Sequence, residues 1–205
     1  MRSILFTLIL FIQAFAFGQF TAVTNTTSIK TFLKEKQNGL KTIESPFVET
    51  TTNPMLKEPQ KGNGQFYFSK PNKIRWENTT SKVTMLMDGK QTKMYEKGKL
   101  VTSAVANKVT ATIQSMIVGM ISGDFLDNGD YTINYLQSST QYRLELTPKN
   151  AKMAKEIKQM NLIFNRSTGI LSTMEMVQKS GATVNYQFTD MKVNKEISNT
   201  KFTQL

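Results

Sequence analysis

The sequence predicts a mainly β protein with helices (α+β class), in which a curved antiparallel sheet carries an apolar hollow under a helical lid. Three observations predict this fold. Runs of alternating apolar and polar residues recur about every ten residues from Tyr131 onward, as in an antiparallel meander. An aromatic hairpin occupies Gly64–Glu77. One stripe of helical spacing, Ser103–Ile121, interrupts a chain otherwise patterned for sheet.

The N-terminal segment 1–18 reads as a signal peptide, which leaves 19–205 as one domain. Arg2 precedes the apolar stretch Ile4–Phe17, and small residues stand at the expected cleavage site before Gln19. A membrane anchor is the alternative, but this stretch is shorter than the roughly 20 residues that span a bilayer. We expect an exported, periplasmic protein cleaved after Gly18.

A helix and a first strand are expected next. Apolar residues recur at helical spacing over 28–38, which predicts an amphipathic helix. Phe47 opens the Thr-rich run Val48–Thr52, which favours a strand. The segment 53–63 contains Pro and Gly and is expected to be a loop or a long hairpin connection.

The hairpin supplies one wall of the hollow. Phe66 and Phe68 alternate onto one face of its first strand, and Ile74 and Trp76 onto one face of its second. Pro71 and the Asn after it provide the turn. Four large apolar side chains, including the only Trp, are therefore expected on one apolar face.

Two further strands are predicted at 82–88 and 91–96, joined by an Asp-Gly hairpin turn. Met85 and Met87 share a face of the first strand. The turn residue Asp88 could be a catalytic acid, but a lone carboxylate before Gly is explained by turn chemistry.

The stripe that follows is predicted to be the lid helix. Ser103 can cap its start and Gly123 can end it. An ordinary helix packed on a sheet is the alternative. Its β-branched residues and Gly119 lower its helix propensity, so packing must hold it. Its apolar residues are Val105, Val109, Ile113, Met116, Ile117, Met120 and Ile121.

The rest of the chain is predicted to be a meander. Strands are expected at Tyr131–Leu136, Gln141–Thr147, Met160–Asn165, Leu171–Gln178, Thr183–Thr189 and Thr200–Gln204, with a helical turn at Asn150–Lys158. Same-face apolar residues on these strands are Tyr142, Leu144, Leu146, Met174, Met176, Val184, Tyr186 and Phe188. Several methionines, Met94 among them, sit on inward faces, and methionine suits either core filling or surfaces that accept varied apolar ligands.

Composition excludes several kinds of function. The chain has no Cys and no His, which removes disulfides, the commonest general base and the commonest metal ligand. The acidic turn 123–130 does not fit a calcium loop, because Leu and Tyr stand at ligand positions. We expect no enzyme activity, no metal and no cofactor. The net charge of +11 raises the question of nucleic acid, but the export signal and scattered lysines argue against it.

The chain resembles the periplasmic outer-membrane lipoprotein carrier (LolA-like) family. The residues that carry the resemblance are Gly64-x-Phe66-x-Phe68, Lys70-Pro71-Asn72-Lys73-Ile74-Arg75-Trp76-Glu77, Asp88-Gly89-Lys90 and Leu144-x-Leu146-x-Pro148-Lys149, with Phe47, Asn185–Phe188 and Phe202 as weaker matches. In order and spacing these pieces extend over nearly the whole chain after the signal peptide.

The resemblance implies an unclosed β-barrel that shields the acyl chains of lipoproteins. Implied partners are acylated lipoproteins, an inner-membrane lipoprotein-releasing transporter and an outer-membrane receptor, with the carrier a monomer. The family's lid-latching arginine corresponds to Lys70 here, with Arg75 as a second candidate, and a family glutamine corresponds to Glu49. Implied acyl-chain contacts are Phe47, Phe66, Phe68, Ile74, Trp76, Met85, Met87, Met94, Val109, Ile113, Met116, Ile117, Met120, Leu144, Leu146, Met174, Met176 and Tyr186.

Three alternatives stay open on sequence alone. A module of the same fold could carry another lipid or sense mislocalised lipoproteins. A periplasmic hydrolase would depend on a carboxylate such as Asp88 or Asp124. A purely structural envelope protein would have no cavity.

Overall fold

The computed structural model describes residues 19–89, 91–102, 119, 123–127 and 129–205. The predicted signal peptide and all of the predicted lid stripe except Gly119 lie outside the described residues. Within the described ranges, none of the helices has the length and apolar character needed to cross a membrane.

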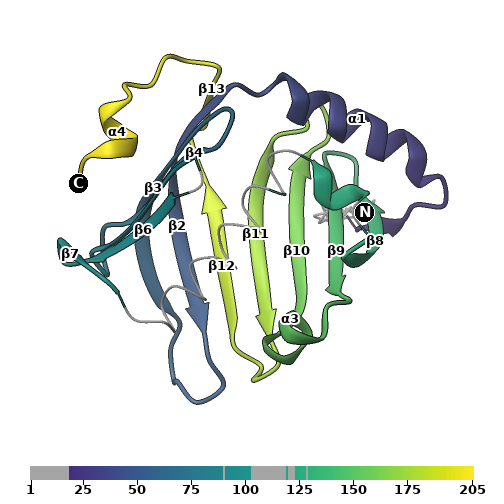
Figure 1. Cartoon of the computed structure of the whole chain (residues 1–205). Coiled ribbons are helices and arrows are strands. Elements are labelled where there is room, and N and C mark those ends of the chain that lie inside the picture. Colours follow the sequence, from purple (N-terminus) through teal and green to yellow (C-terminus); the bar gives the residue numbers. More distant parts are fainter. Residues whose placement is uncertain (1–18, 90, 103–118, 120–122, 128) are drawn as a thin grey trace, which may run out of the picture.

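The described strands form one antiparallel sheet of 13 strands, which fans out in a strongly curved arc (Figure 1). Two meanders, β8 to β12 and β2 to β7, are joined where β12 pairs with β2. The strands are β1 (Thr21–Ala22), β2 (Thr42–Thr52), β3 (Gln60–Ser69), β4 (Lys73–Asn78), β5 (Val83–Asp88), β6 (Gln91–Glu96), β7 (Lys99–Leu100), β8 (Tyr131–Gln137), β9 (Gln141–Pro148), β10 (Ile157–Asn165), β11 (Leu171–Gln178), β12 (Thr183–Phe188) and β13 (Lys192–Val193).

The sheet does not close into a barrel. The two-residue strands β1 and β7 end the strand order, and each pairs with a single neighbour, β8 and β6. The prediction of an α+β fold with an unclosed, mainly antiparallel barrel is therefore confirmed. We call the face that carries Phe47, Phe66, Leu144 and Met174 the concave face, because these side chains belong to one buried apolar cluster.

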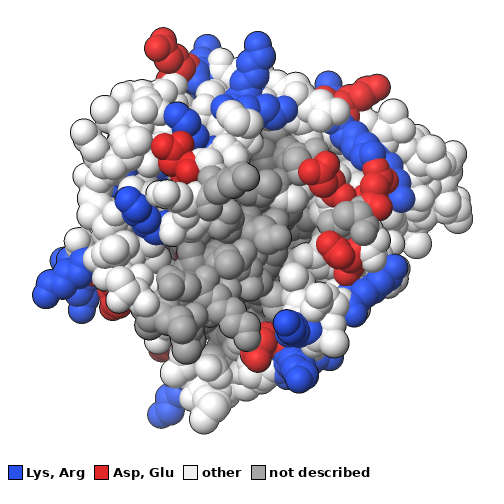
Figure 2. Space-filling view, viewed as in Figure 1, with Lys and Arg blue, Asp and Glu red and all other residues white. Residues whose placement is uncertain are grey.

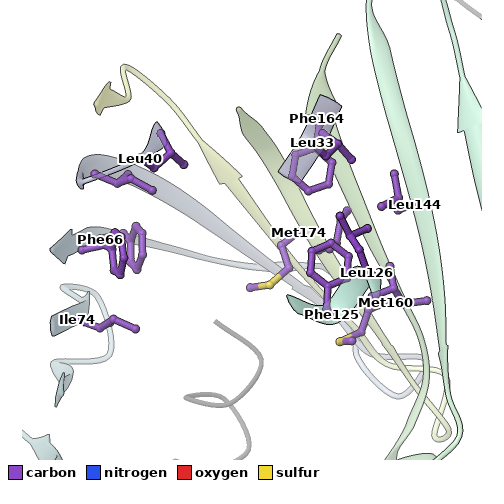
Figure 3. Packing of buried hydrophobic residues seen from close by; sticks show 14 of the residues in the cluster. Leu33, Leu40, Phe66, Ile74, Phe125, Leu126, Leu144, Met160, Phe164 and Met174 are labelled. Carbon is purple, nitrogen blue, oxygen red and sulfur yellow. The ribbon is translucent and has the colours of Figure 1, made fainter. Parts of the chain in front are cut away.

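Helix α1 (Thr26–Gly39) crosses the ends of β9 to β11 and covers one end of the concave face (Figure 1). Its buried residues Ile29 and Leu33 belong to the same cluster as Leu144. Most polar residues of the helix face outward, as amphipathic spacing predicts, and Gln37 is the buried exception. Figure 3 shows the cluster: Leu40, Phe66 and Ile74 lie on the left of the view, Phe164 and Leu144 lie on the right, and Met174 lies between them.

Two short helical elements lie between the strands. The 3₁₀ turn η1 (Asp124–Leu126) contributes two buried side chains to the cluster. Helix α3 (Ala151–Glu156) lies where a helical turn was predicted. Asn150 caps it, because its Oδ1 accepts from the backbone N–H of Lys152 at 2.9 Å and of Met153 at 3.4 Å.

The strand prediction for Thr200–Gln204 is wrong: Thr200–Thr203 forms helix α4. A single large apolar residue, Phe202, anchors this segment, and it is only 2% exposed. Helix α4 contacts β4 and β5. Two contacts stabilise this conformation: the Phe202 ring is buried, and Arg75 donates hydrogen bonds to the backbone carbonyls of Lys201 and Gln204. Neither contact produces a period-2 pattern in the sequence.

The first strand and the following loop also differ from prediction. Strand β2 begins at Thr42 and runs through Pro46, and β3 begins at Gln60, inside the predicted loop. Pro46 is tolerated because the partner of β2 changes there: β13 pairs up to Glu44 and β12 from Phe47. Proline has no backbone N–H to donate, so it fits a position where the hydrogen bonds between β2 and its neighbours β13 and β12 are interrupted.

Candidate functional site

Five aromatic rings from β2, β3, β4 and β12 meet on the concave face. Phe47 lies at the centre, with its ring centroid 4.7 Å from that of Trp76 and 5.6 Å from that of Tyr186. The Trp76 and Tyr186 centroids are 4.9 Å apart in an edge-to-face arrangement. Phe66 and Phe188 complete the group, with centroids 6.0 Å apart. We call these five residues the aromatic cluster.

Gly64 makes this packing possible. It pairs with Phe47 across β3 and β2. A Cβ at Gly64 would lie 2.1 Å from the Phe47 ring and 2.3 Å from the carbonyl oxygen of Glu77. The Phe47 ring therefore occupies the space that any other residue's side chain would need.

A continuous apolar row extends from the aromatic cluster across the other meander. The register links Tyr186 to Met174, Met174 to Leu162, Leu162 to Leu144, and Leu144 to Tyr135. Leu144 and Leu162 are fully buried. A parallel row joins Leu146, Met160 and Met176. The concave face thus offers aromatic, branched and methionine surfaces side by side, which suits flexible apolar ligands.

A cavity of about 40 Å³ lies between the aromatic cluster and the end of α1. Its walls are almost entirely apolar. They are formed by Gln37, Leu40, Ile43, Phe66, Trp76, Ile170, Leu171, Met174, Phe188 and Met191. The polar wall residue, Gln37, is buried and donates from Nε2 to the carbonyl of Gly169 at 3.0 Å.

One carboxylate lies at the edge of the aromatic cluster. Glu49 follows Phe47 on the same face of β2, and its Oε2 accepts from Asn78 Nδ2 at 3.0 Å. The hydroxyl of Tyr186 donates to Glu49. Burial, and then the charge and hydrogen bond of Glu49, raise the pKa of Tyr186.

At the other end of the row, the hydroxyl of Tyr135 is buried and has no hydrogen-bond partner among the described residues. Its side chain is part of the apolar cluster, and the residue is 6% exposed. Burial raises the pKa of Tyr135 to about 12.

This pKa predicts a loss of stability in alkali. An unfolded tyrosine ionises near its ordinary pKa of about 10, before Tyr135 does in the folded protein. The unfolded state then binds fewer protons, so the free energy of unfolding falls as pH rises from about 10 to about 12. Urea unfolding at pH 9 and pH 11 should show a larger fall for the wild type than for Tyr135→Phe. Equal falls would contradict the burial of this phenol.

Lys70 connects the β3–β4 hairpin to α1. Its Nζ donates to the backbone carbonyls of Asn38 at 2.8 Å and Gln37 at 3.4 Å, in the last turn of the helix. These carbonyls carry the negative end of the helix dipole, so a cation is favourable there. The residue predicted as a latch thus holds the helix that covers one end of the concave face. Its predicted role on a lid helix formed by 103–121 stays a prediction.

Replacing Lys70 by methionine should loosen the end of α1. The exposed cation is worth about 0.5 kcal/mol to the helix, and its apolar stem is retained in the variant. Hydrogen exchange should become faster at the Leu40 amide, which donates to Gln37 in the same turn. Lys41→Met is the control, because it removes a neighbouring charge and leaves these contacts intact. Equal exchange in the two variants would rule out the latch.

Arg75 lies on the face of β4 opposite to the concave face. It alternates with Trp76 on β4, and its Nη1 donates to the carbonyls of Gln204 at 2.6 Å and Lys201 at 3.3 Å. Its Nε forms an ion pair with Glu77 at 2.8 Å. These contacts join β4 to the C-terminal segment. The predicted role of Arg75 as a latch for a lid helix formed by 103–121 stays a prediction.

The structure brings most of the predicted acyl-chain residues onto the concave face. Those in the apolar cluster or packed against it are Phe47, Phe66, Phe68, Ile74, Trp76, Met85, Met87, Leu144, Leu146, Met174, Met176 and Tyr186. Met94 pairs with Met85 across β5 and β6. Outside the described residues lie Val109, Ile113, Met116, Ile117 and Met120.

Sequence reasoning missed several residues of the site. Phe188 was on the predicted face of its strand and could have been chosen by alternation alone. Leu40 and Ile43 line the cavity but lie at the helix-to-strand junction, where no periodicity applies. No sequence pattern indicates that the Tyr135 hydroxyl has no partner in the described part of the chain, because a missing partner is a property of three-dimensional packing.

Charged side chains are scattered over the described surface. Figure 2 shows lysines and arginines around the margin of one face, interspersed with acidic side chains. No group of acidic side chains that could hold a metal ion occurs within the described ranges.

A known family matches most of the chain. The family described as "Outer membrane lipoprotein carrier protein LolA" matches residues 38–204. None of the curated proteins searched matches the chain.

Many solved structures resemble the chain, and three of them are described here. A LolA superfamily protein from Nitrosomonas europaea is 15% identical, with 85% of this chain and 97% of that chain covered and a TM-score of 0.46. A putative outer membrane lipoprotein-sorting protein domain from Vibrio parahaemolyticus is 11% identical, with coverage of 85% and 94% and a TM-score of 0.49. The lipoprotein LppX of Mycobacterium tuberculosis is 10% identical, with coverage of 83% and 96% and a TM-score of 0.47.

Proposed function

The chain belongs to the LolA family of outer membrane lipoprotein carrier proteins, and from this premise we propose that it is a periplasmic carrier of lipoproteins. In this proposal it takes acylated lipoproteins from an inner-membrane transporter, shields their acyl chains against the concave face and delivers them to an outer-membrane receptor. The role requires binding and release without a catalytic step.

The observation that carries the proposal is the apolar concave face itself. The aromatic cluster, the Met174 row and the cavity beside them form one surface built from both meanders. Removing an acyl chain from water is worth about 0.8 kcal/mol per CH₂, so such a surface has a strong driving force for acylated cargo.

The size of the cavity indicates how release can occur. Its volume of about 40 Å³ is far below the roughly 300–1,000 Å³ of ordinary ligand pockets. An acyl chain that enters this cavity must therefore displace apolar contacts between the residues that form its walls. The net binding free energy is the difference between burying the acyl chain and losing the apolar contacts that it displaces, and this keeps binding reversible. Methionines such as Met85, Met87 and Met174 ease the exchange because their side chains adapt to new shapes.

Uptake of lipopeptide tests the proposal directly. The purified protein is loaded with the apolar dye ANS, and a triacylated lipopeptide is titrated in. We expect displacement of the dye by the lipopeptide and none by the unacylated peptide of the same sequence. Failure of both to displace it would contradict the carrier function. Equal displacement by phospholipid would indicate a general lipid-binding module of the same fold.

A further inference from the structure

We propose that the Tyr135 hydroxyl is a hydrogen-bond donor for an ester carbonyl of the acylated cargo. The inference rests on the proposed function and deepens it, because it names a chemical group that the concave face recognises besides hydrocarbon. The protein would then bind acyl chains esterified to glycerol more tightly than alkyl chains that lack the ester carbonyl.

The hydroxyl is unusual because it is buried and no described residue is its partner. Its oxygen has no hydrogen bond among the described residues. A buried polar group in that state is costly, and most such groups in folded proteins are satisfied. By contrast, the hydroxyl of Tyr186 donates to Glu49, and that of Tyr131 lies 3.5 Å from the sulfur of Met153.

The position of Tyr135 places this donor on the ligand surface. It stands opposite Leu144 in the register, at the end of the row that leads through Leu162 to Met174. Three strand spacings of about 4.8 Å separate it from Met174, which lines the cavity. A chain lying across the row would have its hydrocarbon on leucine and methionine while its polar end reached the hydroxyl.

The surroundings select the class of ligand group. An ordered water in a protein interior needs two or more polar partners, and the strand neighbours of Tyr135 on this face are Leu144 and, beyond it, Leu162. A charged acceptor would have to lose its hydration there. A neutral carbonyl flanked by hydrocarbon accepts one hydrogen bond and adds little polar surface, which describes the ester of an acyl glyceride.

Helix α1 covers this end of the row. The ammonium of Lys30 lies 6.0 Å from the centroid of the Tyr135 ring. The backbone of Tyr135 is fixed as well, because its carbonyl accepts from the N–H of Val23 at 2.9 Å. The phenol is therefore held in place before the ligand arrives, so little ordering is needed when the hydrogen bond forms.

A pair of matched ligands isolates the hydrogen bond. One is a diacylglyceryl-cysteine peptide, and the other is the same peptide with dialkyl ether chains of equal length. Their affinities are measured by ANS displacement for the wild type, Tyr135→Phe and the control Tyr131→Phe. We expect the wild type and the control to prefer the ester about 3- to 10-fold, the range for one neutral hydrogen bond, and Tyr135→Phe to show no preference.

Stability gives a second readout. Removal of an unsatisfied buried hydroxyl should leave the Tm of ligand-free Tyr135→Phe equal to or above that of the wild type. A lower Tm would show that the hydroxyl already has a partner and would overturn the inference. So would an ester preference that survives in Tyr135→Phe, or its absence in the wild type, while both ligands bind. If neither ligand binds the wild type, the proposed carrier function itself fails.

Discussion

Replacing Gly64 by alanine is expected to destabilise the protein by about 3 kcal/mol or more, the upper range for inserting a methyl group into a packed core. The new Cβ would stand 2.1 Å from the Phe47 ring and 2.3 Å from the Glu77 carbonyl oxygen. Because one obstacle is backbone, a rotamer change cannot relieve the clash. Urea unfolding followed by the fluorescence of Trp76 measures the change.

The matched control is Gly39→Ala at the end of α1. No atom lies within 4 Å of a Cβ built there, so this variant should be as stable as the wild type or up to about 1 kcal/mol more stable. If Gly64→Ala behaved like Gly39→Ala, the close packing of Phe47 on β3 would be wrong. Loss of stability in both would point to a general sensitivity to added methyl groups.

Replacing Trp76 by glutamate should weaken the binding of triacylated lipopeptide by about 10- to 100-fold. The variant removes an aromatic surface worth about 1.5–3 kcal/mol when buried and adds a charge that must be dehydrated by the ligand. Trp76 is only half-buried and lines the cavity, so the substitution should weaken ligand binding more than it destabilises the fold. Displacement of ANS by lipopeptide gives the affinity.

The control for this variant is Gln65→Glu. Gln65 lies on β3 and pairs with Glu77, on the face opposite to Trp76. The same charge is thereby added to the same hairpin outside the hollow. Binding should remain within about twofold of the wild type, and circular dichroism should show both variants folded. An equal loss of binding in the two variants would assign the effect to charge or folding and remove Trp76 from the site.

The regular part of the fold could be predicted because it depends on alternation. Phe66, Trp76 and Leu144 reach the concave face by period 2 alone, and each was identified from the sequence. The amphipathic α1 followed from helical spacing in the same way. The structure follows these patterns because burial of one apolar face is the largest favourable contribution to the free energy of folding.

What could not be predicted depends on contacts between distant parts of the chain. Arg75 matches a family motif, yet its guanidinium binds carbonyls at the C-terminus. The helix at Thr200–Thr203 depends on the burial of Phe202, in a segment that contacts β4 and β5. The fit of Phe47 over Gly64 requires the register of β2 and β3, which hydrophobic spacing does not fix to the residue.

The single tryptophan provides the most direct test that acyl chains bind at the aromatic cluster. Bromine atoms quench indole fluorescence on contact, so the protein is titrated with a lipopeptide whose acyl chains are brominated and with its unbrominated twin. We predict that both bind with equal affinity and that only the brominated chains quench Trp76. Binding of the brominated lipopeptide without quenching would place the acyl chains elsewhere and contradict the account.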